Sequence, residues 1–229
     1  AVDGFSRKVL WLEVTRSNNL PEAVAKFYLD AVRQNEGCPL QTRTDCGTEN
    51  GVIAGAQCYF RSDDNAPFSG EQAHIFGPST HNQRIENWWS HFKKTCSSYL
   101  VDERQLNLDE DFTNECLWFC FNGVLQSSID ETQRYWNTLY IRPSRHETVA
   151  GVPDVLFAIP EEFGAFDCRV EVGSEKLQEI EGNCADAHAD EENIFQEYFH
   201  YYMESQGRQY PVNYNEALEL FSILMTYNE

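Results

Sequence analysis

The chain has 229 residues and carries 37 Asp and Glu against 17 Lys and Arg, so its formal net charge is −20. Hydrophobic residues make up 41% of the sequence and aromatic residues 14%, which predicts a packed core and excludes a disordered chain. The sequence has no run of about 18 apolar residues, which excludes a membrane-spanning helix, and we expect an intracellular protein, nuclear or cytoplasmic, without a signal peptide.

The acidic residues gather in the second part of the chain. Residues 1–100 carry 10 Lys and Arg against 11 Asp and Glu, whereas residues 101–229 carry 7 against 26. Because contacts to nucleic-acid phosphates need cations, the nearly neutral first part suits them better.

Eight cysteines are spread along the chain, and we expect them to be reduced. Cys116 and Cys120 lie in an apolar stretch and are predicted core residues rather than zinc ligands.

The first residues predict a hairpin, a helix and a strand, in that order. A turn after Asp3 leads into the β-rich run 9–14. We expect the strand before this turn to be truncated and to hold Asp3 weakly, since only two residues precede it. Pro21 begins a helix with apolar residues at three- and four-residue spacing, and a short strand follows over 40–44. This order is typical of α/β layered domains.

A second short strand is predicted over 75–78, followed by an amphipathic helix over 82–95. Four residues form one apolar stripe on this helix: Ile85, Trp88, Trp89 and Phe92. Glu86 lies off the stripe and shares its flank with Asn82 and Lys93, so its carboxylate is predicted to face a polar cleft. The alternative is an ordinary exposed glutamate on an amphipathic helix.

The rest of the sequence predicts helices. One or two apolar helices are expected over 112–140, with these core candidates: Leu117, Trp118, Phe121, Val124 and Leu125. Two acidic amphipathic helices are expected over 185–204 and 215–227. The first of them carries an apolar and aromatic stripe that would dock on a core or on a partner: Ile194, Tyr198, Phe199 and Tyr202. We therefore predict a domain over 1–165 and an acidic, largely helical extension over 166–229.

Three short motifs each supply one carboxylate, namely Asp3, Asp45 and Glu86. A strand, a turn at a strand end and a helix could together hold two hard cations over a phosphodiester, as two-metal phosphoryl transfer requires. Mg²⁺ usually takes only one or two protein carboxylates together with substrate phosphate oxygens. The sequence therefore predicts a site for Mg²⁺, or Mn²⁺, at a sparse acidic triad.

The motifs resemble the catalytic core domain of retroviral and transposon integrases, and more narrowly the integrase-core-domain proteins of animal and fungal genomes. In that family an Asp on the first strand precedes a Ser-Arg turn, a second Asp opens a Thr-Asp-x-Gly-x-Glu turn, and a Glu follows in Asn-x-x-x-Glu on a helix. Asp3, Asp45 and Glu86 match these three positions. Later residues resemble the segment that follows the family's triad: Trp136, Asn137, Arg142, Pro143, His146 and Gly151 to Pro153.

The resemblance implies a ribonuclease H-like three-layer fold, with a mixed central sheet and flanking helices. It also implies that the triad binds the metals and catalyses DNA strand transfer or cleavage, and that the protein forms homo-oligomers. Lys93 is the best candidate for a phosphate contact, ahead of Arg84 and Asn82; the alternative is a solvated lysine. Glu49 is either a fourth acidic participant or a cap of the following turn.

Two other functions remain open at this point. The first is a domesticated, catalytically silent integrase-derived protein that binds nucleic acid or another protein, with the acidic C-terminal region as the surface for a protein partner. The second is a hydrolytic nuclease of the same fold.

Overall fold

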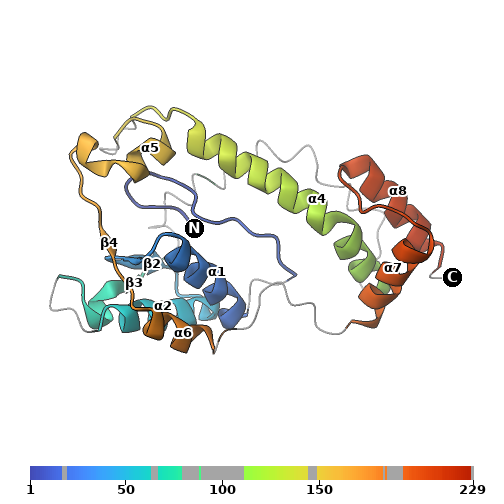
Figure 1. The fold of residues 1–229 in the computed structure, drawn as a ribbon, viewed down its shortest axis with the longest axis horizontal. Coiled ribbons are helices and arrows are strands. Elements are labelled where there is room, and N and C mark those ends of the chain that lie inside the picture. Colours follow the sequence, from blue (N-terminus) through green and yellow to red (C-terminus); the bar gives the residue numbers. More distant parts are fainter. Residues whose placement is uncertain are drawn as a thin grey trace. The chain divides into compact units, whose positions relative to one another are not determined.

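A computed structural model of the chain describes residues 1–16, 20–62, 67–78, 88, 111–143, 149–182, 184 and 193–227. The chain divides into two compact units, each assembled from segments that are distant in the sequence (Figure 1). The first unit comprises residues 1–11, 17–93 and 134–189, and the second comprises residues 12–16, 94–133 and 190–229. The domain boundary that the sequence predicts at residue 165 stays a prediction.

The elements of the first unit are, in chain order, α1 (Pro21–Gln34), β1 (Cys38–Pro39), β2 (Thr42–Thr44), the 3₁₀ turn η1 (Thr48–Asn50), α2 (Gly51–Phe60), η2 (Gly70–Ala73), β3 (His74–Phe76), α5 (Pro153–Ala158), η6 (Pro160–Phe163), β4 (Arg169–Val170) and α6 (Ser174–Glu181). The second unit holds α7 (Ile194–Ser205) and α8 (Tyr214–Met225). Helix α4 (Asp111–Thr138) contributes to both units.

The described strands form two small sheets. Strands β2 and β3 run parallel, with Thr42 opposite His74 and Thr44 opposite Phe76, while β1 and β4 are antiparallel. This helix-rich arrangement with small sheets is compatible with the predicted α/β class. The strands predicted over 40–44 and 75–78 are found as β2 and β3, within a residue or two. A continuous central sheet in three layers stays a prediction, because the strands of the described part form separate pairs.

Helix α1 follows its sequence signals. Proline occupies its first turn, Glu22 and Arg33 complement the helix dipole at opposite ends, and one apolar face is buried. That face packs against α2 in a core made of Ala25, Tyr28, Leu29, Val32, Ile53, Ala56 and Phe60, among others. The Tyr28 hydroxyl donates a hydrogen bond to the buried Gln57 side chain. The buried polar pair is therefore satisfied inside the core.

The β-rich run 9–14 is not a strand, except for one bridge between Val9 and Val2. Side-chain amides of α4 take the place of a neighbouring strand. Gln126 accepts from the Val14 N–H at 2.9 Å and donates to the Leu12 carbonyl at 3.1 Å, and Asn137 bonds Val9 in the same way. The backbone groups are thus paired without a ladder.

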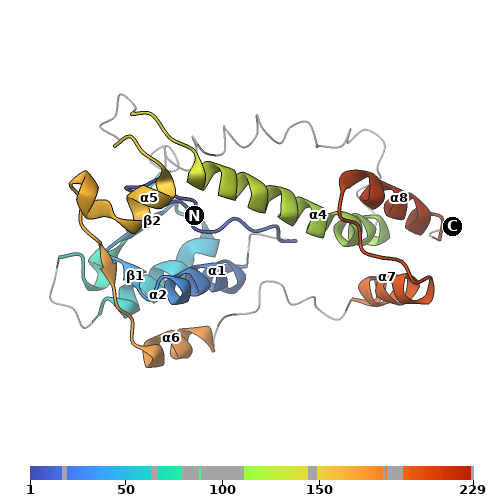
Figure 2. The same cartoon turned by 45° about the horizontal axis from the view of Figure 1, so that its top comes forward.

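A strap formed by β4 and α6 packs on α1 and α2, although it lies beyond residue 165 (Figures 1 and 2). Leu177 and Ile180 of α6 contact the core of the first unit. Strand β4 pairs with β1, where Cys38 lies opposite Val170. A Cβ atom on Gly37 would lie 2.5 Å from the Val170 carbonyl oxygen. The strap therefore depends on a residue without a side chain at this position.

The substitution Gly37→Ala is expected to loosen the strap and to lower the free energy of unfolding by about 1–3 kcal/mol, because the added methyl group overlaps backbone atoms of β4. Hydrogen exchange of the Leu40 amide, which donates to the Cys168 carbonyl, should accelerate. Gly55→Ala is the control, since nothing lies within 4 Å of its added Cβ and alanine favours the helix. Unchanged exchange at Leu40 would contradict the prediction.

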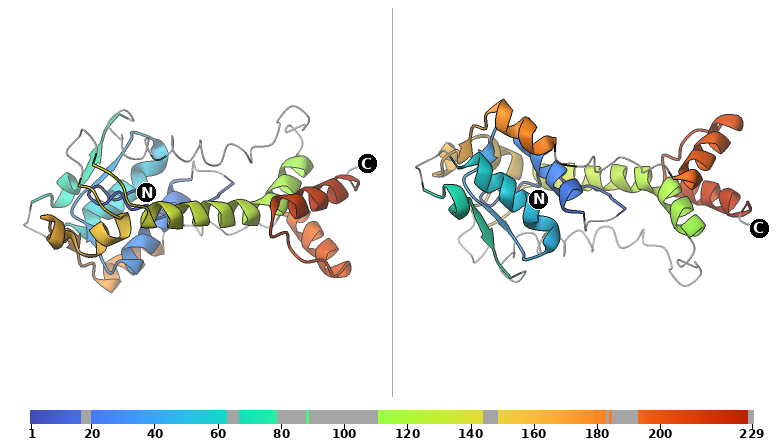
Figure 3. Two further views of the ribbon diagram at one scale, coloured as in Figure 1. Left: turned by 90° about the horizontal axis from the view of Figure 1, so that it is seen from above. Right: turned by 90° about the horizontal axis from the view of Figure 1, so that it is seen from below.

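The second unit has an aromatic core between α4, α7 and α8 (Figure 3). Its buried residues are Cys116, Phe119, Cys120, Phe121, Phe199, Met203, Ala217, Leu220, Phe221 and Leu224. The prediction that Cys116 and Cys120 fill the core is confirmed. Among the predicted core residues, Phe121 is buried and Leu117 and Val124 pack against the core, whereas Leu125 is 42% exposed. The buried face of α4 is centred near Cys116, about half a turn around the helix from Leu125.

Helices α7 and α8 confirm the two helices predicted at the end of the chain, although residues 185–192 lie outside the described residues. The Asn213 side chain accepts from the Glu216 N–H at 3.0 Å, and Glu216 in turn accepts from the Val212 N–H. This reciprocal cap begins α8. Among the helices that the structure describes, none combines the length and apolar character needed to cross a membrane.

Candidate functional site

Asp3 lies at the start of a turn that its own carboxylate organises. Its Oδ2 accepts hydrogen bonds from the Phe5 N–H at 3.1 Å, the Ser6 N–H at 2.7 Å and the Ser6 hydroxyl at 2.7 Å. The Asp3 N–H donates to the Lys8 carbonyl, and the Arg7 N–H donates to the Asp3 carbonyl. Local hydrogen bonds thus fix Asp3, contrary to the expectation that a short preceding strand would leave it weakly held.

The end of α4 clamps this hairpin in place. Asn137 accepts from the Val9 N–H at 2.8 Å and donates to the Val9 carbonyl at 2.9 Å, and both residues are buried. The Trp136 indole N–H donates to the Arg7 carbonyl at 2.8 Å. The Trp136–Asn137 pair therefore has a structural role that its sequence pattern did not reveal: it holds the backbone that carries Asp3.

Asp45 follows the last residue of β2, as predicted. Its Oδ1 accepts a hydrogen bond from the Asn50 side-chain amide at 2.8 Å, and the same amide donates to the Glu49 Oε1 at 3.2 Å. The Glu49 carboxylate lies over Gly47, where a Cβ atom would come within 2.1 Å of it. One amide and one glycine therefore hold two carboxylates side by side in this turn.

His74 is a buried polar residue next to this turn, and it was not among the site residues predicted from the sequence. Its two ring nitrogens lie 2.7 Å from the Thr42 hydroxyl and 3.1 Å from the Thr44 hydroxyl. Burial lowers the pKa of His74 because a cation is poorly solvated there. Strand β3 was predictable from the sequence, but its hydrophobic pattern does not indicate that its first residue, His74, is buried.

Acidification is expected to destabilise the protein through His74. The unfolded histidine binds a proton near pH 6.5, whereas the folded pKa is lower. The contribution of the neutral folded histidine is therefore fully present above pH 6.5 and is lost as the pH falls toward the folded pKa. In urea unfolding at pH 7.5 and 5.5, His74→Gln should lose less stability than the wild type. Equal losses of stability in the wild type and in His74→Gln would contradict the attribution of this pH dependence to His74.

The structure places Asp3 and Asp45 in the same compact unit. Glu86, Asn82, Arg84 and Lys93 lie outside the described residues, so the convergence of the triad stays a prediction. Trp88, from the same predicted helix, is helical and only 1% exposed, in agreement with the predicted apolar stripe. Within the part of the chain that the structure describes, no group of three or more His, Cys, Asp or Glu could hold a metal ion.

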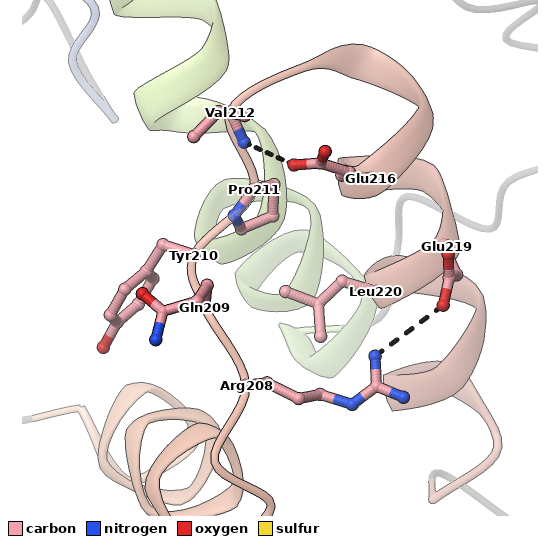
Figure 4. Close-up of a pocket in the computed structure, with 8 residues that line it drawn as sticks. All are labelled: Arg208, Gln209, Tyr210, Pro211, Val212, Glu216, Glu219 and Leu220. Atoms are coloured by element: carbon pink, nitrogen blue, oxygen red, sulfur yellow. Dashed lines mark hydrogen bonds and ion pairs between the residues drawn. The ribbon is translucent and has the colours of Figure 1, made fainter.

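A cavity of about 360 Å³ lies between the α7–α8 connection and α8 (Figure 4). Its lining residues are Arg208, Gln209, Tyr210, Pro211, Val212, Glu216, Glu219 and Leu220. All of them belong to the second unit, whereas Asp3 and Asp45 belong to the first. Neither Asp3 nor Asp45 is among the residues that line this cavity.

An α/β unit with carboxylates fixed in turns at a hairpin and at a strand end is the kind of scaffold on which phosphoryl-transfer enzymes hold metal ions. The family model of the integrase core domain matches residues 1–157. The chain belongs to the integrase core domain family, which confirms the resemblance drawn from the motifs. Comparison with curated proteins and with solved structures gave no match.

Proposed function

We propose that this protein carries out DNA strand transfer or DNA cleavage of the integrase and transposase type, with Asp3, Asp45 and Glu86 as its catalytic and metal-binding residues. Family membership supports this proposal. The observation that carries it further is the fixation of two of the three acids by short hydrogen bonds within local turns. Ligands held in advance are what a catalytic metal site requires.

The chemistry of the donors suits a hard divalent cation. Asp3 uses Oδ2 in its hydrogen bonds and Asp45 uses Oδ1. Oδ1 of Asp3 and Oδ2 of Asp45 make no hydrogen bond among the described residues. Mg²⁺ or Mn²⁺ held by these oxygens and by Glu86 would polarise the phosphodiester and lower the pKa of the attacking water or 3′-hydroxyl.

The chain's own residues would orient these groups. Ser6 directs the carboxylate of Asp3, and Asn50 directs that of Asp45. Lys93 is proposed to bind a DNA phosphate, with Arg84 and Asn82 as weaker contacts. The finer fold assignment belongs to the same proposal: a ribonuclease H-like three-layer domain over 1–165, followed by an acidic helical extension over 166–229.

The test is incubation of the full chain with labelled linear DNA and Mg²⁺ or Mn²⁺, followed by separation of cleaved and joined products. Metal-dependent joined products support strand transfer, and cleaved products alone support the nuclease of the same fold. No products from a folded wild-type protein would overturn the enzymatic proposal.

The alternative is a silent integrase-derived protein that binds a partner. The acidity of residues 101–229, which carry 26 Asp and Glu against 7 Lys and Arg, favours this alternative, because such a region repels a DNA backbone. An active wild type together with inactive Asp45→Asn and Glu86→Gln variants would exclude it. Homo-oligomer formation stays a prediction from the family.

A further inference from the structure

The aromatic stripe predicted on the first acidic helix separates into two faces in the structure. Gln196, Phe199 and Met203 of α7 are 5%, 0% and 2% exposed, and Phe199 packs against Phe119 of α4 with ring centroids 5.2 Å apart. This face docks on the core of the second unit. Tyr202 also packs against this core, so Ile194 and Tyr198 are the residues of the stripe that need a separate explanation.

The opposite side of α7 is exposed and combines apolar with acidic side chains. Ile194, Tyr198 and Tyr201 are 75%, 40% and 69% exposed, and two exposed glutamates lie among them, Glu197 and Glu204. At about 100° per residue these five positions span an arc of about 120°. We call these five residues the tyrosine–glutamate face.

The charges around this face determine what it attracts. Helix α7 contains no Lys or Arg. The described segment 193–227 contains a single Arg, Arg208, and its guanidinium lies 3.8 Å from the carboxylate of Glu219. DNA phosphates and a second copy of the same face are both repelled by this surface. A cationic partner is attracted to it.

The chain itself shows how a lysine fits beside tyrosine and glutamate. On the strap, Lys176 Nζ lies 5.3 Å from the centroid of the Tyr59 ring, and the Tyr59 hydroxyl donates to the Glu179 carboxylate. This contact joins α6 to α2. A cation over an aromatic ring is stabilised by the ring's electron density, and the glutamate orients that ring.

We propose that the tyrosine–glutamate face binds a Lys- and Arg-bearing segment of a partner protein, with cations over the Tyr198 and Tyr201 rings and beside the Glu197 and Glu204 carboxylates. The apolar part of the segment would cover Ile194. This interaction is independent of DNA processing, because none of these residues belongs to the catalytic proposal.

The test uses a fluorescein-labelled amphipathic peptide that carries Lys and Arg on one face, and a matched peptide with Gln at those positions. Fluorescence anisotropy should show that the full chain binds the basic peptide and not the Gln peptide. The double variant Tyr198→Ser/Tyr201→Ser should weaken binding about tenfold, and Glu197→Gln/Glu204→Gln should also weaken it. Because all four side chains are exposed, circular dichroism should stay unchanged.

The matched control is Glu171→Gln/Glu175→Gln, which makes the same change of charge at two exposed positions in the first unit. Its affinity should equal that of the wild type. An equal loss in this control would show attraction to net charge alone and would overturn the proposal. Absence of binding, or unchanged affinity in both face variants, would overturn it as well. A labelled DNA duplex that binds the wild type but not the tyrosine variant would assign the face to nucleic acid instead.

Discussion

The substitution Asp45→Asn is expected to abolish metal-dependent DNA processing, with a loss of at least about a thousandfold in the rate of product formation. Asn keeps the size of Asp and can still accept the hydrogen bond from Asn50, so the turn should remain folded. The change removes the negative charge that a hard cation requires. A bound metal stabilises the transition state by several kcal/mol, and each factor of ten in rate corresponds to about 1.4 kcal/mol.

Asp30→Asn is the matched control for this experiment. Asp30 is an exposed carboxylate on α1, where it lies 2.8 Å from Lys26 Nζ, and the same chemical change there should leave activity and fold intact. Both variants should retain the wild-type unfolding midpoint. Undiminished products from Asp45→Asn would remove Asp45 from the site. If Asp45→Asn is inactive but also unfolded, the less invasive variant Asn50→Ala, which releases the Asp45 carboxylate, should lower the rate in a folded protein.

Sequence signals were sufficient to predict those helices and turns whose determinants are local in the chain. Pro21 and the apolar period after it located α1, and the pairing of Asn213 with Glu216 at the start of α8 is local as well. The turn after Asp3 was also predictable. The bonds from Ser6 to the Asp3 carboxylate are ordinary turn chemistry, so the firm hold on Asp3 was open to prediction from the same residues.

Sequence signals failed where the partner is distant in the chain. Residues 9–14 have the composition of a strand, but the amide of Gln126 reaches them from more than a hundred residues away and replaces the ladder. Gly37 follows the end of α1, and its small size allows the close approach of β4 at Val170. No local pattern reports such contacts. Whether Asp3, Asp45 and Glu86 converge depends on contacts of the same kind, so their convergence stays a prediction.

The substitution Asn137→Ala is expected to lower the free energy of unfolding by about 2–5 kcal/mol. It removes both side-chain hydrogen bonds to the buried Val9 backbone, and removing the partner of a buried polar group costs about 1–3 kcal/mol for each bond. Because domains of this size are stable by about 5–15 kcal/mol, the loss is a large part of the total. Equilibrium unfolding in urea measures it.

Gln126→Ala separates this effect from the general cost of removing an amide. Gln126 also bonds a backbone N–H and a backbone carbonyl of the N-terminal segment, at Val14 and Leu12, but it is only half-buried. Gln126→Ala should therefore lower the free energy of unfolding by less than Asn137→Ala does. The amide resonances of Phe5 and Ser6, which donate to the Asp3 carboxylate, should shift in Asn137→Ala and stay unchanged in Gln126→Ala.

Asn137→Asp distinguishes the two bonds of the clamp. An aspartate still accepts from the Val9 N–H but cannot donate to the Val9 carbonyl, and its charge is buried next to that oxygen. Asn137→Asp should therefore be at least as unstable as Asn137→Ala near pH 7 and should recover stability on acidification, when the carboxyl group gains a proton to donate. A loss of stability that does not depend on pH would mean that the Asn137 side chain only fills space, rather than bonding the segment that follows the Asp3 turn at Val9.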